Sequence, residues 1–166
     1  MNARKLSTLK SLLALTLGLI QVLLVACMSG NVKSAPGTTT TIILIRHAEK
    51  TEKGLVDGSY LIPAGRDRAQ ALVAKVRDMG ITAIYSPDLG RNLDTVKPLS
   101  EQTNVPITII QNMSMFTVDE IADEILSKHA GGVVLYVGNV SGNLMAMHKY
   151  LGGSGKGPVE YGDMAI

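Results

Sequence analysis

Short runs of β-branched and aliphatic residues alternate along this chain with longer segments in which apolar residues recur at helical spacing. The apolar runs predict strands over residues 40–45, 81–86, 105–110 and 133–137. The segments between them predict helices over 66–79 and 88–104, the first opened by Pro63 and ended by Gly80, the second with Asp88 as an acidic N-cap. A third helix is expected after the capping box formed by Thr117 and Glu120.

Strands that alternate with helices predict one fold class. Crossover helices cover both faces of a parallel sheet, and the uninterrupted apolar run at 133–137 is typical of a strand buried on both faces. We therefore expect a three-layer α/β sandwich in which helices flank a largely parallel sheet.

The first residues have the pattern of an export signal. Arg4, Lys5 and Lys10 form a positive start, and residues 11–26 form an apolar stretch, so we expect residues 1–26 to be a signal peptide. The sequence LVAC at 24–27 resembles the lipobox of bacterial lipoproteins, in which the cysteine carries the lipid. Cys27 is the only cysteine and cannot form an internal disulfide, which fits that role. The alternative is an uncleaved membrane anchor, because the apolar run is nearly long enough to span a bilayer.

Both interpretations place the rest of the chain outside the cytoplasmic membrane, in the bacterial cell envelope facing the periplasm or the exterior. Residues 27–40, rich in Ser, Gly and Thr, are expected to be the lipidated N-terminus and a linker. Residues 41–166 are enough for one domain with a single core and too few for two.

Charge gives no support for nucleic-acid binding. The net charge of the whole chain is +2, but three of its sixteen Lys and Arg residues lie in the leader, so thirteen oppose fourteen Asp and Glu in the remainder. The chain has one Phe and no basic run, so the sequence lacks the basic and aromatic residues by which proteins bind nucleic acids.

Arg46 and His47 stand where the first predicted strand ends. Open α/β sheets bind ligands at the carboxyl ends of their strands. A neutral imidazole can attack phosphorus, and a guanidinium matches phosphate oxygens and stays charged at any working pH. The pair therefore favours phosphate chemistry, although two solvated polar residues at a strand end would look the same in sequence.

Four blocks, read in order, resemble the histidine phosphatase superfamily, also called phosphoglycerate mutase-like. They are LIRHAEK at 44–50, LIPAGRDRAQAL at 61–72, IYSPDLGRNLDTV at 84–96 and VVLYVGN at 133–139. The resemblance implies a small lipoprotein member of that family, with His47 as catalytic nucleophile and Arg46 and Arg91 as ligands of the substrate phosphate. It implies neither a metal nor a cofactor.

Arg91 also makes physical sense without the family. It lies near the first turn of a predicted helix, where it can share an anion with exposed backbone N–H groups. A second guanidinium opposite Arg46 would hold a phosphoryl group from two sides.

Asn139 stands where the resemblance implies a second histidine beside the phosphoryl group. An amide can donate a hydrogen bond to phosphate but carries no charge, so we include Asn139 among the phosphate ligands and expect impaired or altered turnover. We predict a phosphatase that forms a phosphohistidine on a small phosphorylated substrate. The alternatives are a pseudophosphatase that binds a phosphorylated ligand or partner, and a degenerate domain truncated at its C-terminus.

No acidic residue can be assigned as general acid from the sequence. Glu49 is close to the nucleophile along the chain, and Asp119 or Glu120 could serve only if their loop folds over the site. Arg68 is expected to be structural and to lie outside the site.

Overall fold

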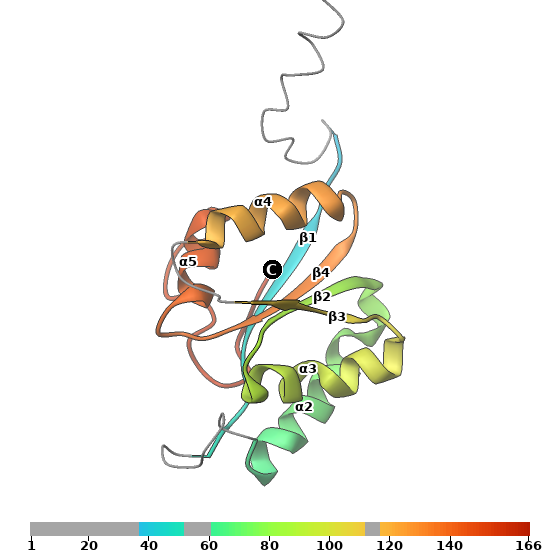
Figure 1. The fold of residues 1–166 in the computed structure, drawn as a ribbon, viewed down its shortest axis with the longest axis vertical. Coiled ribbons are helices and arrows are strands. Elements are labelled where there is room, and N and C mark those ends of the chain that lie inside the picture. Colours follow the sequence, from blue (N-terminus) through green and yellow to red (C-terminus); the bar gives the residue numbers. More distant parts are fainter. Residues whose placement is uncertain (1–36, 52–60, 112–116) are drawn as a thin grey trace, which may run out of the picture. The chain divides into compact units, whose positions relative to one another are not determined.

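Strands and helices alternate along the chain in the computed structural model, which describes residues 37–51, 61–111 and 117–166 (Figure 1). The elements are β1 (Thr41–Arg46), α2 (Pro63–Val76), the 3-10 turn η1 (Arg77–Met79), β2 (Ile81–Pro87), α3 (Gly90–Thr103), β3 (Ile107–Ile110), α4 (Val118–Lys128), β4 (Val133–Gly138), α5 (Asn143–Tyr150) and β5 (Met164–Ala165). The predicted signal peptide and Cys27 lie outside the described residues. Within the described ranges, no helix is both long enough and apolar enough to cross a membrane.

The sheet has five strands in the order β3-β2-β4-β1-β5. β1 and β2 each pair with β4 in parallel, β2 pairs with β3 in parallel, and only β5 runs antiparallel, against β1. The largely parallel sheet expected from the sequence is confirmed.

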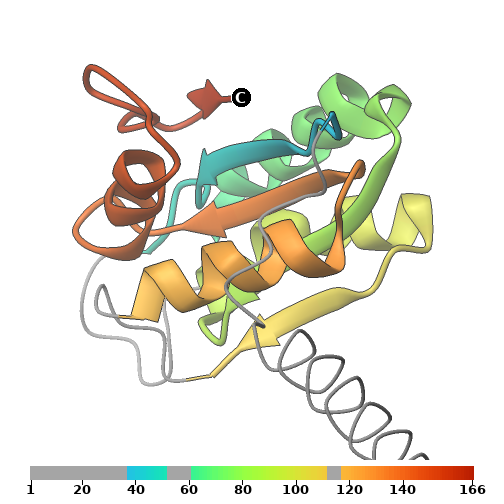
Figure 2. The same ribbon diagram turned by 90° about the horizontal axis from the view of Figure 1, so that it is seen from above.

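The two faces of the sheet are covered by different pairs of helices (Figures 1 and 2). Successive side chains of a strand point to opposite faces, and in β1 the residues Ile43 and Ile45 pack with α2 and α3, whereas Ile42 and Leu44 pack with α4 and α5. Because the β1 side chains on both faces of the sheet are buried, the sequence of β1 is an unbroken hydrophobic run. The three-layer prediction is confirmed. Because helices cover both faces of the sheet, polar residues of a site are expected at the ends of the strands.

Some predicted helix boundaries were wrong. α2 begins at Pro63, three residues before the prediction, because proline at the first helical position lacks only an N–H that has no partner in the helix. α3 begins at Gly90, with Leu89 as N-cap and no capping side chain. Asp88 is instead held toward β3, where its N–H donates to the Ile110 carbonyl and its Oδ2 accepts from Gln111.

The predicted capping box of α4 was also wrong. Thr117 is the N-cap, but its side chain makes no capping hydrogen bond, and the N–H of Glu120 is bound by Oδ1 of Asp119. The end predicted for the first helix is observed. Gly80 ends the α2–η1 segment in the left-handed conformation, at φ 72°.

Candidate active site

Polar residues follow the carboxyl ends of neighbouring parallel strands. Arg46 ends β1 and is paired in register with Gly138, the last residue of β4, so the residues that follow, His47 and Asn139, lie side by side. The His47 N–H donates to the Gly138 carbonyl at 3.2 Å. β2, on the other side of β4, leads into α3 and its second residue, Arg91. This is the edge at which an open α/β sheet binds ligands.

Arg91 and Asn139 are in direct contact. Nε of Arg91 donates to Oδ1 of Asn139 at 3.0 Å. Since the amide oxygen is used by Arg91, the NH₂ group of Asn139 is left to donate to another acceptor. The structure thus brings together the four residues that the sequence singled out, Arg46, His47, Arg91 and Asn139.

His47 is held in one tautomer. Its side chain is only 4% exposed, and its Nδ1 lies 2.8 Å from the Ala48 carbonyl oxygen. A carbonyl oxygen can only accept, so Nδ1 carries the proton and Nε2 keeps its lone pair. That is the arrangement of a nitrogen nucleophile.

The surroundings of His47 keep its ring neutral. Its pKa is lowered to about 4, mainly by burial; the hydrogen bond to Ala48 acts in the opposite direction, and the positive charges of Arg91, Arg46 and Lys50 contribute to the lowering. At neutral pH the imidazole is therefore uncharged while the neighbouring guanidiniums are charged.

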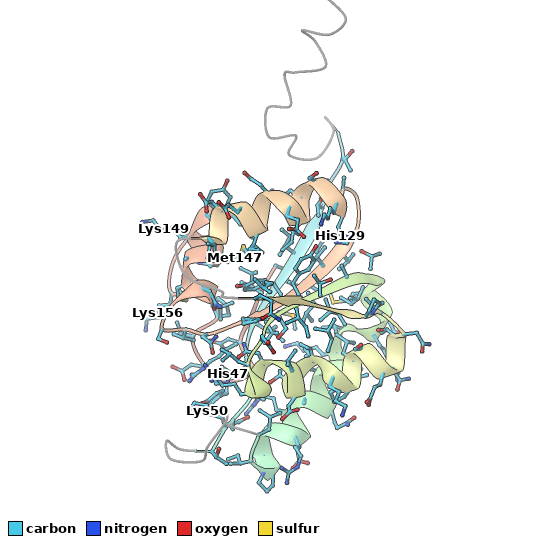
Figure 3. The ribbon with its side chains drawn as sticks, viewed as in Figure 1. His47, Lys50, His129, Met147, Lys149 and Lys156 are labelled. Atoms are coloured by element: carbon cyan, nitrogen blue, oxygen red, sulfur yellow. The ribbon has the colours of Figure 1, made fainter. Side chains whose placement is uncertain are left out.

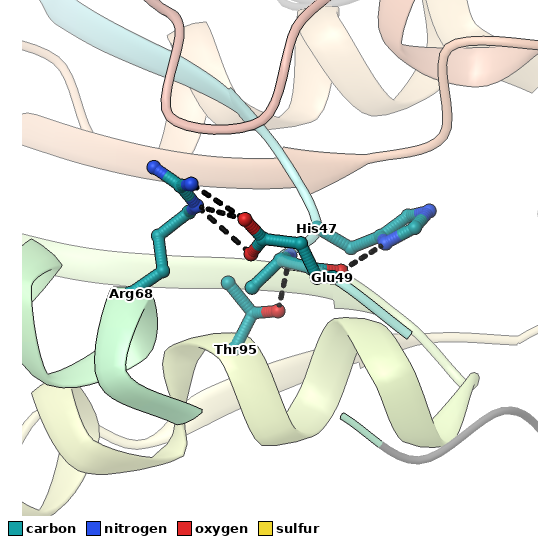
Figure 4. A network of polar contacts seen from close by, with 5 residues as sticks. His47, Glu49, Arg68 and Thr95 are labelled. Carbon is teal, nitrogen blue, oxygen red and sulfur yellow. Dashed lines mark hydrogen bonds and ion pairs between the residues drawn. The ribbon is translucent and has the colours of Figure 1, made fainter. Parts of the chain in front are cut away.

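Thr95 connects the strand end to the helix that carries Arg91 (Figure 4). Its hydroxyl oxygen accepts the Ala48 N–H at 2.9 Å, and the hydroxyl donates to the Arg91 carbonyl at 2.7 Å. Thr95 is 3% exposed, so this link is shielded from water. It holds the residue after His47 at a defined place relative to the first turn of α3. Sequence reasoning did not single out Thr95, although a threonine four residues after Arg91 on the same helix could have indicated such a bond.

Glu49 is committed to an ion pair with Arg68 (Figure 4). Nε of Arg68 donates to both carboxylate oxygens, at 2.9 and 2.8 Å. The hydrogen bond from Arg68 lowers the pKa of Glu49. A carboxylate held in its ionised form is a poor proton donor, so Glu49 does not fit the role of general acid.

Arg46 contacts a segment that sequence reasoning missed. Its Nη1 donates to the Val159 carbonyl at 2.9 Å, and its guanidinium lies 3.8 Å from the centre of the Tyr161 ring. The Tyr161 ring also meets the edge of His47, with the ring centres 5.9 Å apart. Nε of Arg46 is buried without a hydrogen-bond partner. No local sequence signal could have found these contacts, since they join residues more than a hundred positions apart.

A cavity opens beside Arg46, between α2 and the C-terminal segment. Ala48 and Thr95 line it near the strand end, and Arg68 and Lys75 line it on α2. His47 does not line this cavity, so the cavity adjoins the candidate site without containing the His47 ring.

The other two histidines lie elsewhere. Figure 3 shows His129 at the end of α4, well separated from His47, where its Nε2 is 3.0 Å from the Tyr85 hydroxyl. His148 is buried on α5, and a Cβ placed on Gly153 would meet its ring. In the described part of the chain, no three His, Cys, Asp or Glu side chains lie close enough together to hold a metal ion.

Comparison with known proteins assigns part of the sequence to a family. Residues 42–114 match the model of the Histidine phosphatase superfamily (branch 1). This match covers β1, α2, β2, α3 and β3, and so includes Arg46, His47 and Arg91.

Solved structures share the fold. The SixA protein of Agrobacterium tumefaciens, described as a phosphohistidine phosphatase, has a TM-score of 0.59 at 16% identity, over 75% of this chain and 97% of that one. An Escherichia coli protein described as an alpha-ribazole-5'-P phosphatase has a TM-score of 0.58 at 16% identity, over 70% of this chain and 82% of that one. A mycobacterial glucosyl-3-phosphoglycerate phosphatase complexed with VO3 has a TM-score of 0.54 at 16% identity, over 66% of this chain and 80% of that one.

Proposed function

We propose that this protein hydrolyses phosphomonoesters through a phosphohistidine on His47, with support from the match of residues 42–114 to the histidine phosphatase superfamily. The observation that carries the proposal is the state of His47: a neutral imidazole with a free lone pair on Nε2, close to two guanidiniums. Such a ring can attack phosphorus while the positive charges attract the phosphate.

The proposed reaction has two displacements at phosphorus. In the first, Nε2 of His47 forms a bond to phosphorus as the bond to the leaving oxygen breaks. In the second, water adds to phosphorus, the N–P bond breaks, and inorganic phosphate leaves with the proton balance made up by solvent. Arg46, Arg91 and the amide of Asn139 donate to the phosphoryl oxygens, whose charge they stabilise throughout. The guanidiniums supply the positive charge that the step requires.

The ion pair of Glu49 with Arg68 bears on which substrates should react fastest. With its carboxylate held in the ionised form by Arg68, Glu49 is a poor donor of a proton to the leaving oxygen. Small phosphorylated compounds with a stable leaving anion, such as aryl phosphates, should therefore react faster than alkyl phosphates.

A binding protein without turnover is the second candidate, and Asn139 is the observation that favours it. A neutral amide cannot supply the charge of a protonated ring, and a hydrogen bond from a charged donor is worth roughly 1 kcal/mol more, or about fivefold in rate. In this alternative, Arg46, His47 and Arg91 would hold a phosphorylated ligand or partner that is not hydrolysed.

We also propose that the protein is exported and lipid-anchored in the bacterial cell envelope. The support is the sequence of residues 1–27, with its positive start, apolar stretch and lone Cys27 after small residues. A phosphatase at that place would act on phosphorylated compounds of the periplasm or the exterior.

The first experiment measures hydrolysis of an activated aryl phosphate by the purified protein, its His47→Ala variant and its Asn139→His variant. The phosphatase proposal expects turnover in the parent, none in His47→Ala, and an acid-labile phosphoryl group trapped on His47 after rapid quenching. The Asn139→His variant should turn over about fivefold faster than the parent.

The outcome separates the two candidates. An inactive parent whose Asn139→His variant gains turnover would establish a binding protein on a phosphatase fold. Turnover that survives in a folded His47→Ala variant would contradict the role of His47 in either candidate.

A further inference from the structure

Tyr161 contacts two residues of the proposed phosphoryl site. The Arg46 guanidinium lies over its ring, 3.8 Å from the ring centre, and the ring meets that of His47 at an interplanar angle of 60°. Tyr161 is therefore an aromatic residue that bridges the proposed nucleophile and one of the two guanidiniums proposed to bind phosphate.

The other guanidinium proposed to bind phosphate lies at the same strand ends. Nε of Arg91 donates to Oδ1 of Asn139, the residue that follows Gly138, and Gly138 is paired in register with Arg46. The Gly138 carbonyl also accepts from the N–H of His47. The Tyr161 ring, which contacts Arg46 and His47, is therefore close to the position at which both guanidiniums would hold a phosphoryl group.

Three tethers hold Tyr161 in this place. Two residues before it, the Val159 carbonyl accepts from Nη1 of Arg46 at 2.9 Å. After it, β5 pairs with Leu44 and Ile45, the residues that lead directly to Arg46 on β1. The strand that carries the nucleophile therefore also anchors the segment that carries the phenol.

The third tether is a tight turn around Tyr161 itself. The Glu160 N–H donates to Oδ2 of Asp163 at 2.9 Å, and the Asp163 N–H donates to the Glu160 carbonyl at 3.2 Å. Gly162 completes the turn at φ 92°, a left-handed conformation that favours glycine. A side chain there would also meet Nη1 of Arg68. A tyrosine fixed on both sides loses little entropy when its hydroxyl binds a ligand.

We propose that Tyr161 is a catalytic residue whose hydroxyl donates a hydrogen bond to a phosphoryl oxygen held between Arg46 and Arg91. The proposal rests on the phosphoryl site of the proposed function, and it adds the donor that Asn139, already bound to Arg91 through its oxygen, supplies only in part. No proton is transferred in this role, because the phenol donates and keeps its hydrogen. The ligand class is a tetrahedral oxyanion: phosphate itself or a phosphomonoester.

The test uses inorganic phosphate as the probe and the Tyr161→Phe variant of the full chain. Phenylalanine keeps the ring against Arg46 and His47 and removes only the hydroxyl. Loss of one hydrogen bond to a charged acceptor should weaken phosphate binding about tenfold, measured by calorimetry. Tyr150→Phe is the matched control, because its hydroxyl binds Asp123 on the surface, and it should bind phosphate like the parent.

A second measurement observes the tyrosines directly, in the parent as well as in the two variants. The chain has five tyrosines and no tryptophan, so tyrosine dominates its near-ultraviolet absorbance. Phosphate should change that absorbance in the parent and in Tyr150→Phe. The change should be lost in Tyr161→Phe.

The results also separate this proposal from the hydrolysis proposal. Parental phosphate affinity in Tyr161→Phe, or an absorbance change that persists in it, would overturn the role of Tyr161 even in an active phosphatase. Tyrosine-dependent phosphate binding in a parent that turns over no aryl phosphate would keep that role and reject hydrolysis. A parent that binds no phosphate would overturn both.

Discussion

His47 shows how burial can keep the ring of one residue neutral at a cost in stability in acid. Burial and three nearby cations keep its ring neutral in the folded protein, which preserves the lone pair on Nε2. The same surroundings make a charged ring unfavourable. The reactive state at neutral pH and the acid sensitivity of the fold therefore have one cause.

Acid should destabilise the protein through His47. Its pKa is lowered from 6.5 to about 4, so between these values the unfolded chain binds a proton that the folded chain does not. Stability is thus full above pH 6.5 and falls as the pH drops, by about 3 kcal/mol at pH 4. Urea unfolding at pH 7 and near pH 4 should show this loss in the parent and a smaller loss in His47→Gln. A His47 ring that titrates near pH 6.5 by NMR would contradict the prediction.

At the scale of elements, the start of α2 is docked against the chain just after His47. The Ile62 N–H donates to the Glu49 carbonyl at 3.1 Å, and the first turn of α2 then passes so close that Gly65 has no room for a side chain. A Cβ on Gly65 would lie 2.1 Å from the Glu49 oxygen. Glycine stands here because of that approach, although it is a poor helix former.

Gly65→Ala should be destabilising even though alanine favours helices. Intrinsic propensity would stabilise α2 by about 1 kcal/mol, but the overlap with Glu49 backbone requires a shift that costs about 1 to 3 kcal/mol or more. We expect a net loss of unfolding free energy and reduced turnover, because the shift reaches the neighbour of His47.

Denaturant unfolding and aryl phosphate hydrolysis measure the two effects of Gly65→Ala. Gln70→Ala, on the exposed face of the same helix, is the control and should change neither. A Gly65→Ala protein more stable than its parent would contradict this prediction, because the Glu49 backbone would then have moved away from the new methyl group at little cost.

At the scale of the whole molecule, the site combines parts that are distant in sequence. β1 supplies Arg46 and His47, the first turn of α3 supplies Arg91, β4 leads to Asn139, and the segment before β5 supplies Tyr161. The parallel sheet collects the first three at one edge because all these strands end on the same side. The antiparallel pairing of β5 with β1 places the segment that carries Tyr161 next to β1.

The export proposal belongs to this scale as well. We expect Cys27→Ser to abolish lipid attachment, so that the protein no longer incorporates radiolabelled palmitate and no longer fractionates with membranes. His47→Ala is the matched control and should remain lipidated and membrane-bound. Unchanged membrane fractionation of Cys27→Ser would favour the uncleaved anchor instead.

The sequence alone determined the fold class, and it singled out the four residues that the structure brings together in the candidate site. Apolar runs between helical segments predict a parallel sheet covered by helices, because the local periodicity shows which faces of each element are buried. Residues that follow the ends of parallel strands, such as His47, then lie at one edge of the sheet. Local patterns failed where a distant contact competed, as when Asp88 turned toward β3 and left α3 without an acidic cap.

Only the tertiary structure decided the environment of the site. The lowered pKa of His47, the ion pair that occupies Glu49 and the placement of Tyr161 on Arg46 all depend on burial and on contacts between remote segments. Such interactions leave no periodic trace in the sequence, because they follow from where the folded chain brings its parts together in space.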